Sequence, residues 1–431
     1  MRNLRDYAVI TGTYWVFTLT DGALRMLVLL HLHERGYSPL EIATLFLFYE
    51  LFGVVTNLLG GWIGARYGLK STLFSGLSLQ ITAFTLLAAA AVNLTLPVVM
   101  AAQAMSGTAK DLTKMSAKSY VKLVVPEGDQ HGLMRWVAIL TGSKNTLKGV
   151  GFFLGGLLLT SLGFRGATVA MAVALVVSLG AASLMLPPAA GRAASEVRLS
   201  QVVSRDPKVN WLSASRLFLF GSRDIWFVLA LPLFLASVLG WTHTQVGGFL
   251  ALWIIGYGFI QALAPVYVGG GRGAAGRPPP TARGLGLWTI ALVLPLAGIL
   301  TALTLGASPS VTLIVGLVVF GAVFATDSAI HSYLIVSYAD SDSVSLSVGF
   351  YYMANAAGRL TGTLLSGVLY QAAGEGFDGL RISLAASVLF VVVSSALCIP
   401  LRAAEVGASG PALRGLRRRR SPAGAGPRGR S

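Results

Sequence analysis

The chain has 431 residues, of which 54% are hydrophobic and only 12% are charged. A soluble protein of this length needs more charged residues to cover its surface, so the composition predicts an integral membrane protein. The net charge of +16 does not indicate a nucleic-acid-binding protein, because the basic residues gather in alternate loops and in the tail after residue 401.

The polar start, Met1 to Asp6, leads into a long apolar stretch without a small-residue cleavage site, which predicts a first spanning helix and not a removable signal peptide. Eleven further apolar segments of spanning length follow. The expected spans are 8–32, 40–63, 72–92, 97–119, 133–162, 166–187, 211–239, 244–268, 284–305, 309–336, 346–371 and 380–401. The predicted fold is therefore an all-α membrane protein of twelve transmembrane helices.

We expect four parts along the chain: a six-helix half over 1–190, a cytoplasmic linker over 191–210, a second six-helix half over 211–401 and a basic disordered tail over 402–431. The tail contains Arg414, Arg417 to Arg420 and Arg428, a pattern typical of a cytoplasmic segment that is attracted to anionic lipid.

Basic residues also predict the orientation. The expected outside loops contain only Arg35, Arg165 and Arg381. The expected inside set is Arg2, Arg5, Arg66, Lys70, Lys118, Lys122, the 192–208 cluster, Arg272, Arg277, Arg283 and the tail. Because inside loops carry the excess of lysine and arginine, we expect both termini in the cytoplasm, in a bacterial inner membrane.

The two halves repeat each other in sequence. GYSPLEIATLFLFYELFG from residue 36 aligns with GWTHTQVGGFLALWIIGYG from 240, KSYVKLVVPEGD from 118 with HSYLIVSYADSD from 331, and KGVGFFLGGLLL from 148 with RLTGTLLSGVLY from 359. Parallel repeats of this kind face each other around an axis along the membrane normal, which predicts a central pathway between them.

GGWIGARYGLK (60–70) resembles the loop signature of the major facilitator superfamily. Gly61, Arg66, Gly68 and Lys70 fit that signature, whereas Ala65 stands where an acid is usual, so a gating salt bridge made by that acid is not expected. The alternative interpretation is a tight turn on the positive side of the membrane.

GVGFFLGG (149–156) resembles the glycine-rich antiporter motif of the same superfamily, with Phe152 where proline is usual. Gly151 and Gly155 form a GxxxG pattern that allows two helices to pack backbone to backbone. Helix packing is the simpler interpretation of this motif.

Charged residues inside the spans favour an anionic substrate. The basic candidates are Arg25, Lys110, Lys114, Arg135, Lys144, Lys148, Arg216, Arg223 and Arg359, and the acidic candidates are Asp21, Glu50, Asp111, Asp224 and Asp327. A charge at mid-bilayer costs roughly 2.5–3.5 kcal/mol, so each needs a partner, water or the interface. The excess of cations predicts that an incoming anion completes the site.

Position along the helices refines this set. Arg135, Arg216 and Arg223 are expected near helix ends, where they snorkel to the interface. Asp21 with Arg25, and Asp111 with Lys114, have spacings that permit ion pairs within one helix.

The repeat places basic residues of the first half opposite a mixed set in the second. Lys114 aligns with Asp327, Lys118 with His331, Lys144 with Asn355, and Lys148 with Arg359. Asp327 and His331 share a helix face, so they either carry a proton, since histidine titrates near neutrality, or form a polar pair that holds the helix. Glu50 is a third candidate for proton coupling.

Five blocks resemble the organoarsenical efflux permeases called ArsJ: residues 13–31, 36–69, 100–119, 135–156 and 349–371. The resemblance runs from about residue 7 to 400. It implies export of 1-arseno-3-phosphoglycerate, which a glyceraldehyde-3-phosphate dehydrogenase makes from arsenate, and hence arsenate resistance. A sugar-phosphate or other organic-anion permease and a drug exporter are the alternatives.

From charge and symmetry we expect Arg25, Lys110, Lys114, Lys144, Lys148, Asn355 and Arg359 to bind this anion. We assign gating or structural roles to Asp21, Asp111, Gly61, Arg66, Gly68, Gly151 and Gly155. Neither a nucleotide-binding GxxxxGK[ST] motif nor a metal or catalytic constellation occurs in the sequence, and Cys398 is the single cysteine. We therefore expect no enzyme activity, cofactor, metal or nucleic-acid partner.

Overall fold

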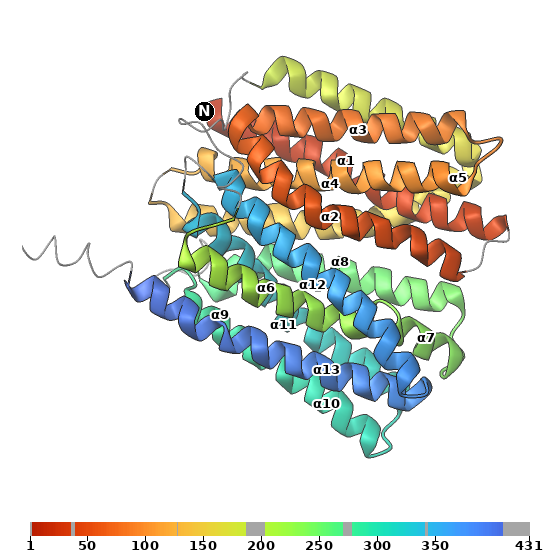
Figure 1. The fold of residues 1–431 in the computed structure, drawn as a ribbon, viewed down its shortest axis with the longest axis vertical. Helices are drawn as coiled ribbons and strands as arrows, with labels where there is room; N and C mark the ends of the chain where they lie inside the picture. The colour runs from red at the N-terminus through yellow and green to blue at the C-terminus, as the bar shows by residue number, and fades with distance from the viewer. Residues whose placement is uncertain are drawn as a thin grey trace, which may run out of the picture.

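Every regular element in the described part of the chain is an α-helix (Figure 1). The computed structural model describes residues 2–35, 39–126, 128–186, 203–269, 278–340 and 344–407. The helices are α1 (Arg2–Glu34), α2 (Pro39–Tyr67), α3 (Leu69–Ala89), α4 (Leu96–Val124), α5 (Gln130–Met185), α6 (Pro207–Phe227), α7 (Ala230–Ser237), α8 (His243–Val268), α9 (Ala282–Ala291), α10 (Val293–Thr304), α11 (Pro309–Tyr338), α12 (Val344–Ala372) and α13 (Gly376–Ala396).

These helices make twelve membrane spans within the described ranges. Gly163, at φ 64° and ψ 178°, divides α5 into two spans. Conversely, α6 and α7 form one span over 207–237, and α9 and α10 form one over 282–304. The predicted all-α fold of twelve spans is confirmed.

Among the described residues, seven helical stretches are long and apolar enough to cross a membrane by length and composition alone; α5 counts as one of them, and α2 is not in the set. Helices α1, α4 and α12 are not among the seven. They carry charged residues such as Asp21, Lys114 and Arg359. Because these helices are too polar for lipid on every side, they need neighbours inside the protein.

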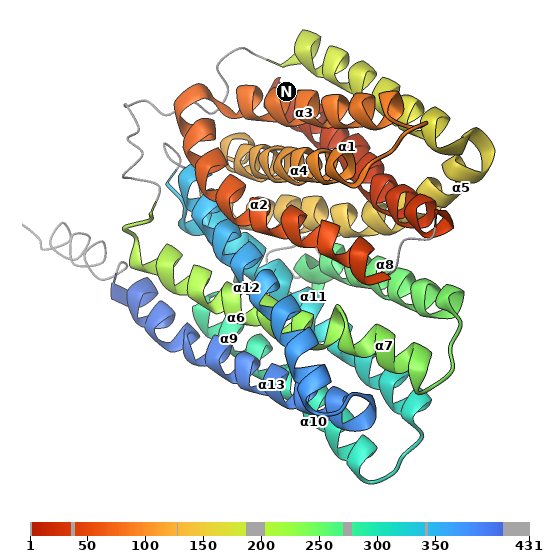
Figure 2. The same ribbon diagram turned by 45° about the vertical axis from the view of Figure 1, so that its right-hand side comes forward.

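The helices form two bundles, which we call the N-terminal half (α1–α5) and the C-terminal half (α6–α13). The halves pack side by side through α2 against α12 and α5 against α8 (Figures 1 and 2). The expected linker falls largely on residues 187–202, which lie outside the described part of the chain.

Most helix boundaries differ from the expected spans by a few residues, and three of these differences bear on the site or the tail. Helix α6 begins at Pro207 and not at 211, because the Asp206 side chain caps it by accepting a hydrogen bond from the Lys208 amide at 2.8 Å. Helix α4 continues past 119 to Val124. The last span continues to Gly407, past the expected end at 401. Residues 408–431, most of the expected tail, lie outside the described residues.

Glycines let α1 and α5 pack in backbone contact. A Cβ atom on Gly151 would lie 2.6 Å from the Leu19 carbonyl oxygen, and one on Gly155 would collide with the Ala23 carbonyl. Gly22 faces the same seam, with the Lys148 carbonyl 2.7 Å from its would-be Cβ. The GxxxG pattern therefore serves packing within the N-terminal half.

We expect Gly151→Val to lower the thermal stability of the purified protein, because overpacking a close seam costs about 1–3 kcal/mol. The measurement is the melting temperature in detergent. Gly180→Val is the matched control, since Gly180 lies on the same element and has nothing within 4 Å of its would-be Cβ. Equal melting temperatures for the two variants would contradict the assignment.

The halves meet most closely at one end of the bundle. We call the end at which α1 begins the N-terminal end; it lies on the left in Figure 1. There Ser345 donates a hydrogen bond to the Gly61 carbonyl at 3.0 Å, and a Cβ on Gly349 would lie 2.8 Å from the Gly61 Cα. From this crossing α2 and α12 diverge toward the opposite end in both ribbon views (Figures 1 and 2).

A second set of contacts closes the same end. Gln130, at the start of α5, accepts hydrogen bonds from Tyr333 at 3.0 Å and from Ser337 at 3.1 Å, both on α11. Lys122 of α4 donates to the Ser337 carbonyl at 3.3 Å. The structure is thus closed at its N-terminal end.

Candidate substrate site

Basic side chains from four helices meet at the interface of the halves. Lys144 of α5 interacts electrostatically with Lys110, Lys114 and Arg359, and Lys148 does so with Arg25, Lys110 and Arg359. We call Arg25, Lys110, Lys144, Lys148 and Arg359 the central cluster. All five side chains are half-buried. The structure therefore places Lys144, Lys148 and Arg359, three residues of the repeat alignment, within electrostatic range of one another, together with Arg25 and Lys110.

Two buried carboxylates serve these cations. Asp111 forms an ion pair with Lys114 at 2.5 Å and a longer one with Lys110 at 4.0 Å. Asp224 forms ion pairs with Arg223 at 2.6 Å and with Arg359 at 3.2 Å. Because each carboxylate is shared by two basic side chains, its single negative charge cannot neutralise both of them.

The two halves carry an acidic residue at corresponding positions, Asp21 on α1 and Asp224 on α6. Asp21 of α1 interacts electrostatically with Lys148 of α5. In the C-terminal half Asp224 of α6 pairs with Arg359 of α12. Because the repeat alignment equates Lys148 with Arg359, each half carries an acid on its first helix and a base on its fifth.

Arg223 and Arg216 do not snorkel, so that expectation is wrong. Arg223 is ion-paired with Asp224, and Arg216 is only 3% exposed. Because α6 starts at Pro207, both residues lie well inside the span. Arg135, near the start of α5, is exposed as expected.

Arg216 binds neutral groups of the C-terminal half. It donates to Asn355 Oδ1 at 2.9 Å through Nε and to Ser328 Oγ at 3.0 Å through one terminal nitrogen. Its guanidinium lies 3.8 Å from the Phe220 ring centre. Asn355 therefore accepts a hydrogen bond from Arg216 through its side-chain oxygen.

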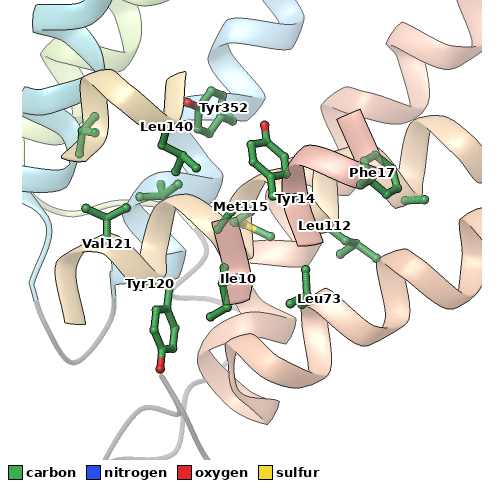
Figure 3. Packing of buried hydrophobic residues seen from close by; sticks show 14 of the residues in the cluster. Ile10, Tyr14, Phe17, Leu73, Leu112, Met115, Tyr120, Val121, Leu140 and Tyr352 are labelled. Carbon is green, nitrogen blue, oxygen red and sulfur yellow. The ribbon is translucent and has the colours of Figure 1, made fainter. Parts of the chain in front are cut away.

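Lys118 is not an inside-loop residue, which corrects the expected orientation set. It is 2% exposed because α4 continues to Val124. Lys114 and Lys118 both lie over the Tyr352 ring, with Nζ 4.2 Å and 5.6 Å from its centre. Figure 3 shows Tyr352 near Tyr14 of α1, with which it interacts electrostatically.

We call Lys114, Lys118 and Arg216 the inner cluster. At 1.5 Å per residue they lie about 9–15 Å from the ends of α4 and α6 at the closed N-terminal end. Lys110 and Lys144 lie about 21 Å from the corresponding ends of α4 and α5. Sequence reasoning placed Lys118 and Arg216 at helix ends; the cap at Asp206 was the signal for the longer α6.

No hydrogen bond joins Asp327 to His331 in the described part of the chain. Asp327 and His331 are both 0% exposed, yet Asp327 Oδ1 accepts its hydrogen bond from Thr289 at 3.0 Å. Both ring nitrogens of His331 lack a hydrogen-bond partner in the described part of the chain. Glu50 belongs to α2, but its side chain lies outside the described residues.

The 60–70 motif forms the turn between α2 and α3. Gly68 has φ 91°, a value that favours glycine, and it caps α3. The exposed Arg66 stacks on its neighbours, with its guanidinium 5.2 Å from the Trp62 ring and 5.7 Å from the Tyr67 ring. Ala65 is 1% exposed, so a carboxylate there would be buried.

A surface cavity of about 250 Å³ lies between α4 and α5 at the N-terminal end. Its lining includes Lys122, Asp129 and Gln130 and none of the candidate site residues. The cavity therefore belongs to the closed end and not to the central cluster.

Comparisons with known proteins agree with this architecture. The model of the Major Facilitator Superfamily matches residues 10–300. No curated protein sequence matches significantly. Among solved structures, the E. coli fucose:proton symporter FucP is 13% identical, with a TM-score of 0.71 over 93% of this chain and 99% of that one.

Two further structures have the same fold. A bacterial homologue of the iron transporter ferroportin in its outward-facing state is 14% identical (TM-score 0.72; 92% of this chain and 99% of that one). The human organic anion transporter MFSD10 is 17% identical (TM-score 0.67; 92% and 99%). At these identities the likeness shows the fold alone. Together with the family match over most of its length, it establishes that the chain belongs to the Major Facilitator Superfamily, whose members are membrane transporters.

Proposed function

We propose that this transporter exports an organic anion that carries an arsenate and a phosphate group, namely 1-arseno-3-phosphoglycerate, and so confers arsenate resistance. The observation that carries the proposal is the central cluster of five basic residues. Two of them, Lys110 and Arg359, share their carboxylate with a basic residue outside the cluster: Asp111 also pairs with Lys114, and Asp224 also pairs with Arg223. The resemblance of five sequence blocks to the ArsJ permeases supplies the identity of the anion.

The shape of the cluster suits an anion with two charged ends. Lys148 and Arg25 lie on the α1–α5 side, while Arg359 lies on α12 in the other half. Arginine binds an oxyanion with two parallel hydrogen bonds, and lysine acts as a point charge. A substrate bridging these groups neutralises both halves at once.

The direction of transport depends on which end of the bundle faces the cytoplasm. We place the N-terminal end in the cytoplasm of a bacterial inner membrane, since Arg66, Lys70 and Lys122 lie at that end. The described conformation is then closed to the cytoplasm and is the one that releases substrate outside. Asp327, His331 and Glu50 remain the candidates for proton coupling. In such an antiport, protons enter the cell as the substrate leaves it.

The functional partner in this scheme is a glyceraldehyde-3-phosphate dehydrogenase that makes the substrate. Arsenate accumulation should therefore fall only in cells that contain both the transporter and this enzyme. Tolerance to arsenite should be unchanged. A strain protected against arsenite alone, or against arsenate without the enzyme, would overturn the assignment.

We expect Lys144→Gln, Lys148→Gln and Arg359→Gln each to reduce arsenate efflux at least about tenfold, because each removes a charge-assisted contact worth about 1.5 kcal/mol or more. The matched control is Arg135→Gln, which removes an exposed cation from the same helix as Lys144. Normal efflux by all three central variants would rule out the central cluster as the substrate site.

A sugar-phosphate permease is the second candidate, because the same cations bind any organic phosphate. It differs in one respect: a sugar phosphate would be transported without arsenate or the dehydrogenase. A drug exporter for cations is disfavoured, since such a substrate needs unpaired acids, whereas Asp111 and Asp224 are already paired.

A further inference from the structure

The inner cluster contains a buried amine that its surroundings do not satisfy. Lys118 is 2% exposed, and its Nζ has no hydrogen-bond partner among the described residues. The charged groups with which it interacts electrostatically are Arg216, Lys144 and Lys114, all of them cations. A buried ammonium without a partner is costly, so this site is arranged for an anion.

Arg216 adds a guanidinium cation to the inner cluster. Within the described part of the chain, Arg216 donates hydrogen bonds to the neutral side chains of Asn355 and Ser328. Asp327 interacts with Arg216 electrostatically and offsets part of this charge, while one of its carboxylate oxygens accepts from Thr289. Lys114 is paired with Asp111. Lys118 is therefore the basic residue of the inner cluster that interacts with no carboxylate in the described part of the chain.

Two adjacent tyrosine rings lie beside the three basic residues of the inner cluster. Tyr351 and Tyr352 have ring centres 5.2 Å apart. Lys118 lies over the Tyr352 ring, and the Arg216 guanidinium lies 5.3 Å from the Tyr351 ring centre. The buried Tyr351 hydroxyl also lacks a partner in the described part of the chain and is available to donate a hydrogen bond.

The inner cluster is formed by residues from both halves of the protein. Lys118 comes from α4, whereas Arg216 and Tyr351 come from α6 and α12. The crossing of Gly61 and Gly349 closes the N-terminal end beside it. An anion can therefore reach the inner cluster when the two halves separate at the N-terminal end.

We propose that Lys118, Arg216 and Lys114 form an inner oxyanion site, distinct from the central cluster, that receives a phosphate- or arsenate-type group when the N-terminal end opens. The inference rests on the proposed transport of an oxyanion and extends it: the substrate is first bound at the inner site and then passes to Lys144, which interacts with Lys114.

The test measures protection of a local thiol. Ser332→Cys places a reporter on α11 beside Tyr352, with which Ser332 interacts, and Cys398→Ser removes the native cysteine. The protein is held in phosphatidylcholine nanodiscs, and the alkylation rate by N-ethylmaleimide is followed by mass spectrometry. Inorganic phosphate is compared with potassium chloride at equal ionic strength.

We expect phosphate to slow alkylation at least about threefold, and Lys118→Gln to abolish this protection, since loss of a charge-assisted contact weakens phosphate affinity about tenfold. Lys118→Arg should retain it. Lys148→Gln should also retain it, because Lys148 belongs to the central cluster. Equal melting temperatures check that the Lys118→Gln variant folds.

Three results would overturn the inner site: no protection by phosphate, protection that survives Lys118→Gln, or protection that Lys148→Gln abolishes. A fourth is protection by anionic phosphatidylglycerol in the nanodisc without phosphate, which would identify a lipid headgroup as the ligand. The assay needs neither arsenate nor the dehydrogenase. Failure of arsenate export with intact phosphate protection would therefore reject the proposed substrate and keep the inner site.

Discussion

Gly349→Val should abolish transport while leaving the protein folded. A Cβ on Gly349 would lie 2.6 Å from the Asn57 carbonyl oxygen and 2.8 Å from the Gly61 Cα, so a larger side chain keeps α2 and α12 apart at the N-terminal end. The contact joins the two halves and not helices within one half. We therefore expect a protein that cannot complete the transport cycle, with efflux reduced by more than about a hundredfold, since separating a backbone contact costs about 3 kcal/mol.

The conformational effect of Gly349→Val is measurable with the Ser332→Cys thiol, which should be alkylated faster when the N-terminal end cannot close. Gly298→Val is the control, because Gly298 is exposed on α10 with nothing within 4 Å of its would-be Cβ. Normal efflux by the Gly349→Val variant, or slower alkylation, would show that the closed contact of α2 and α12 is not part of the cycle.

Asp224→Asn should destabilise the C-terminal half strongly. Asp224 is 1% exposed and pairs with both Arg223 and Arg359, so its loss leaves two cations without their carboxylate. Removing one partner of a buried pair costs about 3 kcal/mol or more. We expect a marked fall in melting temperature and loss of efflux.

A second substitution separates charge from packing in this network. Adding Arg359→Gln to the Asp224→Asn variant removes one of the two stranded cations and should recover part of the melting temperature. Asp378→Asn breaks an exposed ion pair with Arg381 and should change the melting temperature little, because surface pairs contribute at most about 1 kcal/mol. If the two substitutions, Asp224→Asn and Arg359→Gln, changed the melting temperature in a strictly additive way, the two residues would not belong to one ion-pair network.

Much of the fold could be predicted from the sequence because the bilayer imposes a simple length rule on each span. The repeat alignment also paired Lys148 with Arg359, and these two side chains do interact electrostatically. Lys144, which the alignment paired with Asn355, interacts with Arg359 as well. The relation held because the repeats conserve helix register even where residue types differ.

Arg216 and Lys118 were misplaced for a physical reason. Hydropathy marks where apolar residues begin, and the polar ends of α6 and α4 lie outside that signal. Within a protein interior those polar turns remain helical, because neighbouring helices and not lipid surround them. The partners of Arg216, Asn355 and Ser328, come from two distant helices, so no local pattern indicated them.

The polar character of α1, α4 and α12 also bears on how the chain is made. Helix α4 leaves the ribosome early, yet Tyr352, the ring on which Lys114 and Lys118 rest, is synthesised more than two hundred residues later. Until then its ammonium groups face lipid or a water-filled insertion channel, which disfavours release of α4 into the bilayer. We therefore expect the N-terminal half to complete its membrane insertion only after α12 has been translated. A chain truncated after α5 should be retained by the insertion machinery or degraded.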